Sequence, residues 1–315
     1  MCNGSIMDKL ISFSLPLMVS GILQLAFNAV DIIVVGRFSG SQALAAVGST
    51  TALINVFTNL FIGISLGANV LAARFYAAGK DREMSETVHT SITLALISGI
   101  TMAVIGVLLA KWALEIMGTP DDVIGQSALY MRIYFMGMPF FMLYNYGAAI
   151  LRAIGDTKRP LIFLIISGIA NAALNMTLVI IFHMGVAGVA IGTIISQLIS
   201  CVLVLTCLYR SEGSYQLRFS KLKINGAYME QIFQVGVPAG IQSTVINLSN
   251  ALLQSSVNSF GSTAMAGYTA ANNIFGFLYI SVNSITQSCM SFTSQNYGVR
   301  KTKRMDKILI DCMIL

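Results

Sequence analysis

Long apolar segments follow one another along almost the whole chain of 315 residues. A helix needs roughly 20 apolar residues to cross the hydrocarbon core of a bilayer, because each residue rises only about 1.5 Å. Eight segments reach that length, and polar loops separate them. The predicted spans are 10–36, 43–76, 88–110, 124–150, 160–183, 186–209, 230–258 and 264–297, with a further one that begins near Lys307. The sequence therefore predicts an all-α polytopic membrane protein.

Composition excludes the main soluble alternatives. Hydrophobic residues make up 56% of the chain and charged residues only 10%, whereas a typical soluble domain carries roughly 25% charged residues. So few charges cannot cover a water-facing globule, and so apolar a chain is not disordered. The sequence shows no zinc spacing, no phosphate-binding lysine loop and no dinucleotide fingerprint. We therefore expect no cofactor and no metal centre.

The basic side chains are distributed unequally between the two sides of the membrane. Sixteen of the 19 lie at the N-terminus or in every second connection, against two, Arg37 and Lys111, in the other connections. The sixteen are Lys9, Arg74, Lys80, Arg82, Arg152, Lys158, Arg159, Arg210, Arg218, Lys221, Lys223, Arg300, Lys301, Lys303, Arg304 and Lys307. The positive-inside rule predicts a cytoplasmic N-terminus in the cell membrane. The topology then accounts for the net charge of +6, and we expect no nucleic acid as a partner.

The two halves of the chain show a weak internal repeat. A shift of about 222 residues aligns Pro16 with Pro238. The pattern predicts a six-helix lobe over 1–209, a cytoplasmic loop over 210–228, and a partial second lobe over 229–315 with two spans and the start of a third. An even number of crossings makes the repeats parallel. A complete second lobe would continue well past Leu315, so we expect a fragment or a truncated remnant.

Polar side chains inside the predicted spans mark the candidate site. A carboxylate at bilayer depth costs several kcal/mol unless it is protonated, paired or hydrated. Asp31 lies inside the first span, and spacings of three and four residues place Asn28 and Gln24 on its face of the helix. The stripe predicts a polar cavity. The alternative is that Asp31 only touches water at the outer end of the span.

Other spans repeat this pattern with amide and hydroxyl side chains at helical spacing. They are Asn55 and Asn59; Asn171 and Asn175; Thr193, Ser196 and Ser200; and Ser243, Asn247, Asn250, Gln254 and Asn258. One buried amide can simply join two helices, but so many together predict a cavity between bundles. Pro16 and Pro139 lie inside spans and predict kinks, since proline lacks a backbone N–H. A kink at Pro16 is either a bending point linked to the charge of Asp31 or a static packing feature.

One motif resembles an enzyme signature. Residues Gly63 to Gly67 read G-x-S-x-G, the pattern of a hydrolase nucleophile. That serine needs a strand-to-helix turn, whereas Ser65 lies within a long helical segment. The two histidines, His89 and His183, are predicted at opposite membrane surfaces, away from the depth of Ser65. We therefore predict that the chain is not an enzyme.

Three segments together resemble a known transporter family. They are Asp31 to Arg37 (DIIVVGR), Leu151 to Pro160 (LRAIGDTKRP), and Gly185 to Thr193 (GVAGVAIGT). They are similar to the multidrug and toxic compound extrusion (MATE) transporters over essentially the whole chain. The resemblance implies a lipid-embedded monomer whose two six-helix lobes enclose a cleft that opens to each side in turn. It also implies export of amphipathic, often cationic, drug-like compounds against inward H⁺ or Na⁺.

The resemblance also assigns expected roles to individual residues. Asp31 matches the cation-coupling aspartate, where Na⁺ could bind, and Pro16 the bending proline. The expected coupling group is Asp31, Asn28, Asn145, Asn171, Asn175 and Thr193; the expected substrate cavity is Gln24, Asn55, Asn59, Asn247, Asn250 and Gln254. Asn175 is an amide where one branch of the family carries a second aspartate, and the seventh span lacks the glutamate of another branch. Coupling is therefore expected to depend on the first lobe.

Two alternatives to an exporter stay open at this point. A lipid-linked oligosaccharide flippase of the same superfamily would need a strongly cationic cavity for pyrophosphate. Arg132 is the only basic residue well inside a predicted span, and it could extend to the interface. A truncated remnant without transport activity is the other alternative.

Overall fold

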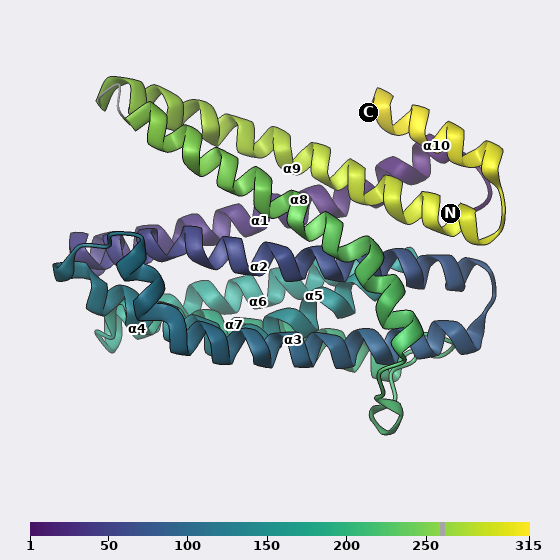
Figure 1. The fold of residues 1–315 in the computed structure, drawn as a ribbon, viewed down its shortest axis with the longest axis horizontal. Coiled ribbons are helices and arrows are strands. Elements are labelled where there is room, and N and C mark those ends of the chain that lie inside the picture. Colours follow the sequence, from purple (N-terminus) through teal and green to yellow (C-terminus); the bar gives the residue numbers. More distant parts are fainter. Residues whose placement is uncertain (259–261) are drawn as a thin grey trace.

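The computed structural model describes residues 1–258 and 262–315, and within these ranges the structure is helical apart from short connections (Figure 1). The helices are α1 (Ile6–Phe38), α2 (Gly40–Ala77), α3 (Asp81–Ile116), α4 (Asp121–Met136), α5 (Met138–Ala153), α6 (Lys158–Met176), α7 (Gly185–Arg210), α8 (Gly226–Asn258), α9 (Ser262–Gly298) and α10 (Thr302–Ile314). The predicted fold class is confirmed. In the described residues, five helical segments are long and apolar enough to cross a membrane: α1, α2, α3, Lys158–Ile181 and α7.

The two prolines predicted to kink spans behave differently. The span predicted over 124–150 is two helices, α4 and α5, which meet at Gly137 because Pro139 at the start of α5 has no N–H to donate. At Pro16, by contrast, α1 continues as one helix, and the Pro16 carbonyl accepts a hydrogen bond from Ser20 Oγ at 2.8 Å. A bending role for Pro16 stays a prediction.

The predicted repeat is visible in the helix lengths. Helices α1 and α8 both have 33 residues and an internal proline, Pro16 and Pro238. Helices α2 and α9 have 38 and 37 residues. Below, the first half means residues 1–210 and the second half residues 226–315. In Figure 1, α8 and α9 cross over the helices of the first half, and the N-terminus lies near α10.

The two halves meet most closely where α2 crosses α8. No room exists there for a Cβ atom: on Gly63 it would overlap the backbone of Gly240, and on Gly67 it would overlap the carbonyl oxygen of Ile232. Gly236 is packed in the same way against Ile64. We call this contact the glycine seam. Paired small residues let two helices approach until their backbones touch.

The seam explains the G-x-S-x-G motif without any enzyme chemistry. Gly63 and Gly67 both touch the backbone of α8. Ser65 lies between them, is 2% exposed, and donates a hydrogen bond from its Oγ to the carbonyl of Ile62 at 2.6 Å. The motif is therefore part of a helix-packing surface.

Buried hydrogen bonds join the two halves on one side of the seam. Ser14 Oγ donates to Ser288 Oγ at 2.8 Å. Ser291 Oγ donates to Asn69 Oδ1 at 3.0 Å, and Asn69 Nδ2 donates to the carbonyl of Ala149 at 2.8 Å. These bonds lie toward the N-terminus and the basic loops, and we call this end of the molecule the closed end.

The connection between the halves is held against α3. His89 is 3% exposed; its Nδ1–H donates to the carbonyl of Ser85 at 2.6 Å, which leaves Nε2 to accept the N–H of Arg218 at 3.1 Å. Asn225, just before α8, donates from its side chain to Glu86 Oε2 at 2.8 Å. The loop predicted over 210–228 is thus fixed to the first half.

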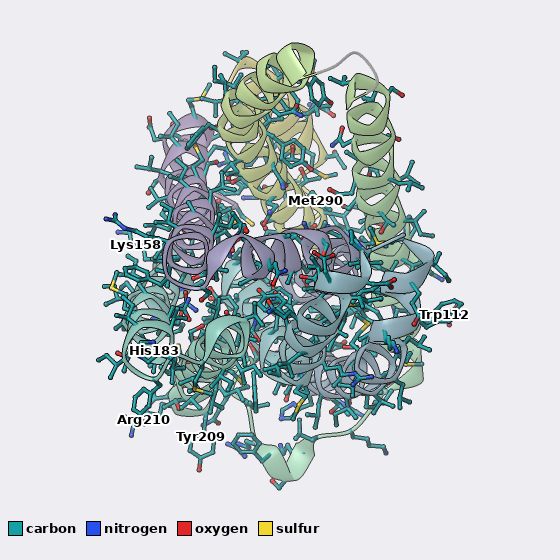
Figure 2. All side chains as sticks on the ribbon, turned by 90° about the vertical axis from the view of Figure 1, so that its left-hand side faces the viewer. Trp112, Lys158, His183, Tyr209, Arg210 and Met290 are labelled. Carbon is teal, nitrogen blue, oxygen red and sulfur yellow. The ribbon has the colours of Figure 1, made fainter. Side chains whose placement is uncertain are left out.

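The single tryptophan lies on the outer surface. Trp112 is in the last turns of α3, is 59% exposed, and projects away from the bundle (Figure 2). It follows Lys111, whose ammonium group lies 3.8 Å from a carboxylate oxygen of Glu115. An exposed indole near a helix end is typical of the aromatic belt at a membrane interface.

Candidate functional site

Asp31 and two asparagines of α6 form a chain of polar groups between helices. Asp31 is half-buried and lies about 10 Å along α1 from its end at Phe38. Asn175 Nδ2 donates a hydrogen bond to Asp31 Oδ1 and lies 3.3 Å from Asn171 Oδ1. Asn175 is completely buried. The four-residue spacing of the asparagines, read from the sequence, is what aligns them here.

A glycine of α7 makes the space for Asn175. The side-chain oxygen of Asn175 lies where a Cβ of Gly192 would be, and this buried oxygen has no hydrogen-bond partner. The small residues Gly188, Gly192 and Ser196 of α7 are buried, and small side chains at this spacing let two helices pack closely. A π-helical turn, Thr177–Ile181, begins two residues after Asn175, and such turns are frequent at functional sites.

Two tyrosines of α4 lie within electrostatic range of the Asp31 carboxylate, although in the described residues α4 does not pack closely against α1. Tyr130 and Tyr134 stack with ring centroids 6.1 Å apart. Gln197 of α7 lies over Gly137, where its side-chain oxygen fills the space of a Cβ. Sequence analysis missed these tyrosines because aromatic residues four apart in an apolar span are typical of ordinary core packing.

The remaining residues of the expected coupling group lie apart from this chain of contacts. Thr193 follows Gly192 but donates its hydroxyl to Val189 within α7, at 2.9 Å. Asn28 is exposed on α1. Asn145 is on α5, donates within that helix to the carbonyl of Phe141 at 2.8 Å, and in the described residues α5 does not pack against α1. Of the group, the structure brings Asn171 and Asn175 to Asp31.

The expected cavity residues lie on α1, α2 and α8, beyond the glycine seam from the closed end. Gln24, Asn55 and Asn250 are exposed, and Asn59 is half-buried. Asn247 is also half-buried and donates to the carbonyl of Ser243 in its own helix at 2.8 Å. The side chains of Gln254 and Asn258 are outside the described residues.

The site offers a carboxylate without a permanent counter-charge. Across the residues that the structure describes, Asp31 forms no ion pair, and no cluster of three metal-binding side chains occurs. The amide of Asn175 stabilises the carboxylate but cannot neutralise it. A proton or a sodium ion could do so, and either would change the charge of a membrane-spanning helix.

The sequence profile of the MatE family matches residues 16–177 and 238–315, and the two segments begin at the pair of prolines that the repeat aligns. The chain is 31% identical over 306 residues to a Bacillus subtilis protein named "Probable multidrug resistance protein YoeA", with 94% of this chain and 66% of that protein covered. It is 24% identical to a protein of Shewanella oneidensis named "FAD transporter", with 96% of this chain and 67% of that protein covered.

Solved structures show the same fold. One, described as the outward-facing conformation of a multidrug resistance MATE family transporter, has a TM-score of 0.91 at 21% identity and covers 98% of this chain and 69% of that chain. The chain spans about two thirds of the length of the relatives it matches. By its sequence matches, repeat and fold, the chain belongs to the MATE family.

Proposed function

We propose that the chain is a secondary active exporter of amphipathic or cationic compounds. Inward movement of H⁺ or Na⁺ would drive export, and Asp31 would carry the coupling charge. The name of the Bacillus subtilis relative supports export of drugs. The name of the Shewanella oneidensis relative concerns a large anion, so the experiment below includes both classes of substrate.

The observation that carries the proposal is the environment of Asp31. A carboxylate inside a span is costly, and a structural one would be expected to have a fixed cationic partner. Here its hydrogen-bond partner is the neutral amide of Asn175, held by Gly192 and next to Asn171. Such a site can alternate between charged and neutral forms, which is what an ion-coupled transporter requires.

The packing between the halves supports alternating access. The halves are joined by the glycine seam and by buried hydrogen bonds on its closed-end side, while Asn55 and Asn250 on its other side are exposed. On the predicted topology this arrangement is open to the outside. Neutralising Asp31 can shift the protein to another state only if the two states bind the ion with different affinity.

The proposal is tested by reconstituting the chain in vesicles with a dye-efflux assay. Ethidium serves as the cationic probe and FAD as the anionic one, each under an imposed proton gradient and, separately, a sodium gradient. We expect ethidium transport with one of the gradients. The variant Asp31→Asn should abolish it, because the amide cannot be protonated and carries no charge to attract Na⁺.

The matched control is Asp122→Asn. Asp122 is an exposed carboxylate in the first turn of α4, so the same substitution there should leave transport unchanged. Normal ethidium transport by Asp31→Asn would contradict the coupling role. No gradient-driven transport by the unmodified chain would contradict the exporter itself, and transport of FAD in place of ethidium would replace the proposed substrate class.

A further inference from the structure

A basic cavity lies at the closed end, where the turn that follows α2 meets the turn that follows α9. Its volume is about 420 Å³. The lining residues are Arg74, Phe75, Ala78, Lys80, Tyr297, Gly298, Arg300 and Thr302. We call it the junction cavity. It shares no residue with the Asp31 site, and the proposed transport chemistry gives it no role.

Direct backbone contact holds the two turns together. A Cβ on Gly298 would overlap the carbonyl oxygen of Arg74, so the ends of α2 and α9 touch there. Arg300 has a left-handed backbone with φ of 58°, and its N–H donates to the carbonyl of Tyr297 at 3.0 Å. A residue with a side chain adopts this conformation rarely, and here it places Arg300 beside the cavity.

The charge of the cavity is largely uncompensated. Lys80 has a carboxylate neighbour, Glu83, at 3.4 Å. Arg74 and Arg300 form no ion pair among the residues that the structure covers. The guanidinium of Arg74 lies 5.0 Å from the ring centroid of Tyr297, and this cation–π contact orients it while leaving its charge free for an anion.

The surroundings of the cavity indicate the kind of anion. One large aromatic side chain that lines it, Tyr297, is 54% exposed, as is typical of residues at the level of lipid headgroups. Basic pockets between helix ends on the cytoplasmic side bind anionic lipid headgroups. Arginine offers several N–H donors in the geometry that phosphate oxygens accept.

We propose that the junction cavity binds the phosphate of an anionic phospholipid headgroup between Arg74 and Arg300, with Lys80 at its edge. The exposed ring of Tyr297 faces the membrane interface, and the acyl chains stay in the bilayer. The placement in the cytoplasmic leaflet depends on the predicted topology.

Binding would have a conformational consequence, which rests on the proposed function. The cavity has one wall from the first half and one from the second, so it is complete only while the closed end is packed. A headgroup in it therefore binds this state more tightly than one in which the halves separate there, and favours it by that difference in affinity.

The test uses the purified chain in detergent, titrated with phosphatidylglycerol or with neutral phosphatidylcholine. The measurements are the number of lipids retained in native mass spectrometry and the midpoint of thermal unfolding. We expect one phosphatidylglycerol to be retained at concentrations where phosphatidylcholine is lost, with a rise in the midpoint of several degrees. The double variant Arg74→Gln/Arg300→Gln should lose both effects.

Two further variants separate binding from net charge and from misfolding. Arg210→Gln/Arg218→Gln removes the same charge from exposed positions outside the cavity, and should retain the lipid. Arg74→Lys/Arg300→Lys keeps the charge and should retain more lipid than the glutamine variant. Equal retention by the glutamine variant and the unmodified chain would overturn the proposal, as would equal loss in the control.

Titration with inorganic phosphate distinguishes a lipid headgroup from free phosphate as the ligand of the junction cavity. At matched phosphate concentration without lipid, it should shift the midpoint much less than phosphatidylglycerol does. An equal shift, lost in Arg74→Gln/Arg300→Gln, would overturn the lipid assignment and make the site one for free phosphate.

Discussion

Helix α2 carries two asparagines that differ in burial and hydrogen bonding, one on each side of the glycine seam. Asn69, toward the closed end, is 2% exposed and uses both ends of its amide, toward Ala149 of its own half and Ser291 of the other. Asn55, on the other side, is exposed. The same residue type in one helix thus links helices through hydrogen bonds in one place and is part of a candidate cavity surface in the other.

The difference teaches that the position of an amide relative to the seam decides its role. Where Gly63 and Gly67 let α8 approach, nearby polar groups are buried and must pair, since an unpaired buried polar group is costly. Beyond the seam, α8 diverges from α2 (Figure 1), and the amides of Asn55 and Asn250 are exposed. The following variants test this comparison in order of decreasing effect.

The largest effect is expected at the seam itself. Gly63→Leu places a side chain where the backbone of Gly240 lies, so the halves cannot pack without displacement, at a cost of about 3 kcal/mol or more in the free energy of unfolding. Gly48→Leu is the matched control, because a Cβ there meets nothing within 4 Å. Thermal unfolding in detergent measures both. Equal stability of the two variants would show that the seam does not hold the halves together.

A smaller effect is expected from the buried amide. Asn69→Ala removes the partner of Ser291 and of the Ala149 carbonyl, and should lower the free energy of unfolding by about 1–3 kcal/mol. Asn55→Ala should change it by less than about 0.5 kcal/mol, as for an exposed residue. Denaturant titration of both variants is the measurement. A larger loss of unfolding free energy in Asn55→Ala than in Asn69→Ala would contradict the roles assigned to the two asparagines.

The smallest effect concerns the loop between the halves. His89→Asn removes the acceptor for the Arg218 N–H, so trypsin should cut after Arg218 and Lys221 several times faster, with little change in global unfolding. His183→Asn, the same change at the exposed histidine, should leave the cutting rate unchanged. Unaltered cutting in both variants would show that His89 does not hold the loop.

Local pattern was sufficient to predict most of the fold. Apolar length predicted the helices, and the aligned prolines Pro16 and Pro238 predicted the repeat, because both features depend on one helix at a time. The break at Gly137 was predicted only as a kink, since the effect of Pro139 depends on how the neighbouring helices accommodate it. Where a helix begins or ends because of packing against its neighbours, its own sequence does not predict the boundary.

The site was predicted where it follows from helical spacing and missed where it follows from packing. The spacing of Asn171 and Asn175 predicts that they share a face of one helix, whereas their approach to Asp31 was implied only by the family resemblance. Tyr130 and Tyr134 have no polar pattern of their own, and only the placement of α4 brings them near Asp31. The role of Asn69 could not be predicted from α2 alone, because its hydrogen-bond partners belong to α5 and α9.

The lone tryptophan also gives the protein a built-in optical probe. Trp112 lies on the outer surface of α3, away from the Asp31 site, and it is the chain's only indole. Its emission wavelength therefore reports the polarity at one defined depth, and quenching by brominated lipids would reveal whether the chain is inserted. Because the fluorophore is remote from the seam, a signal change on adding substrate would report reorientation in the bilayer and not contact with the bound compound.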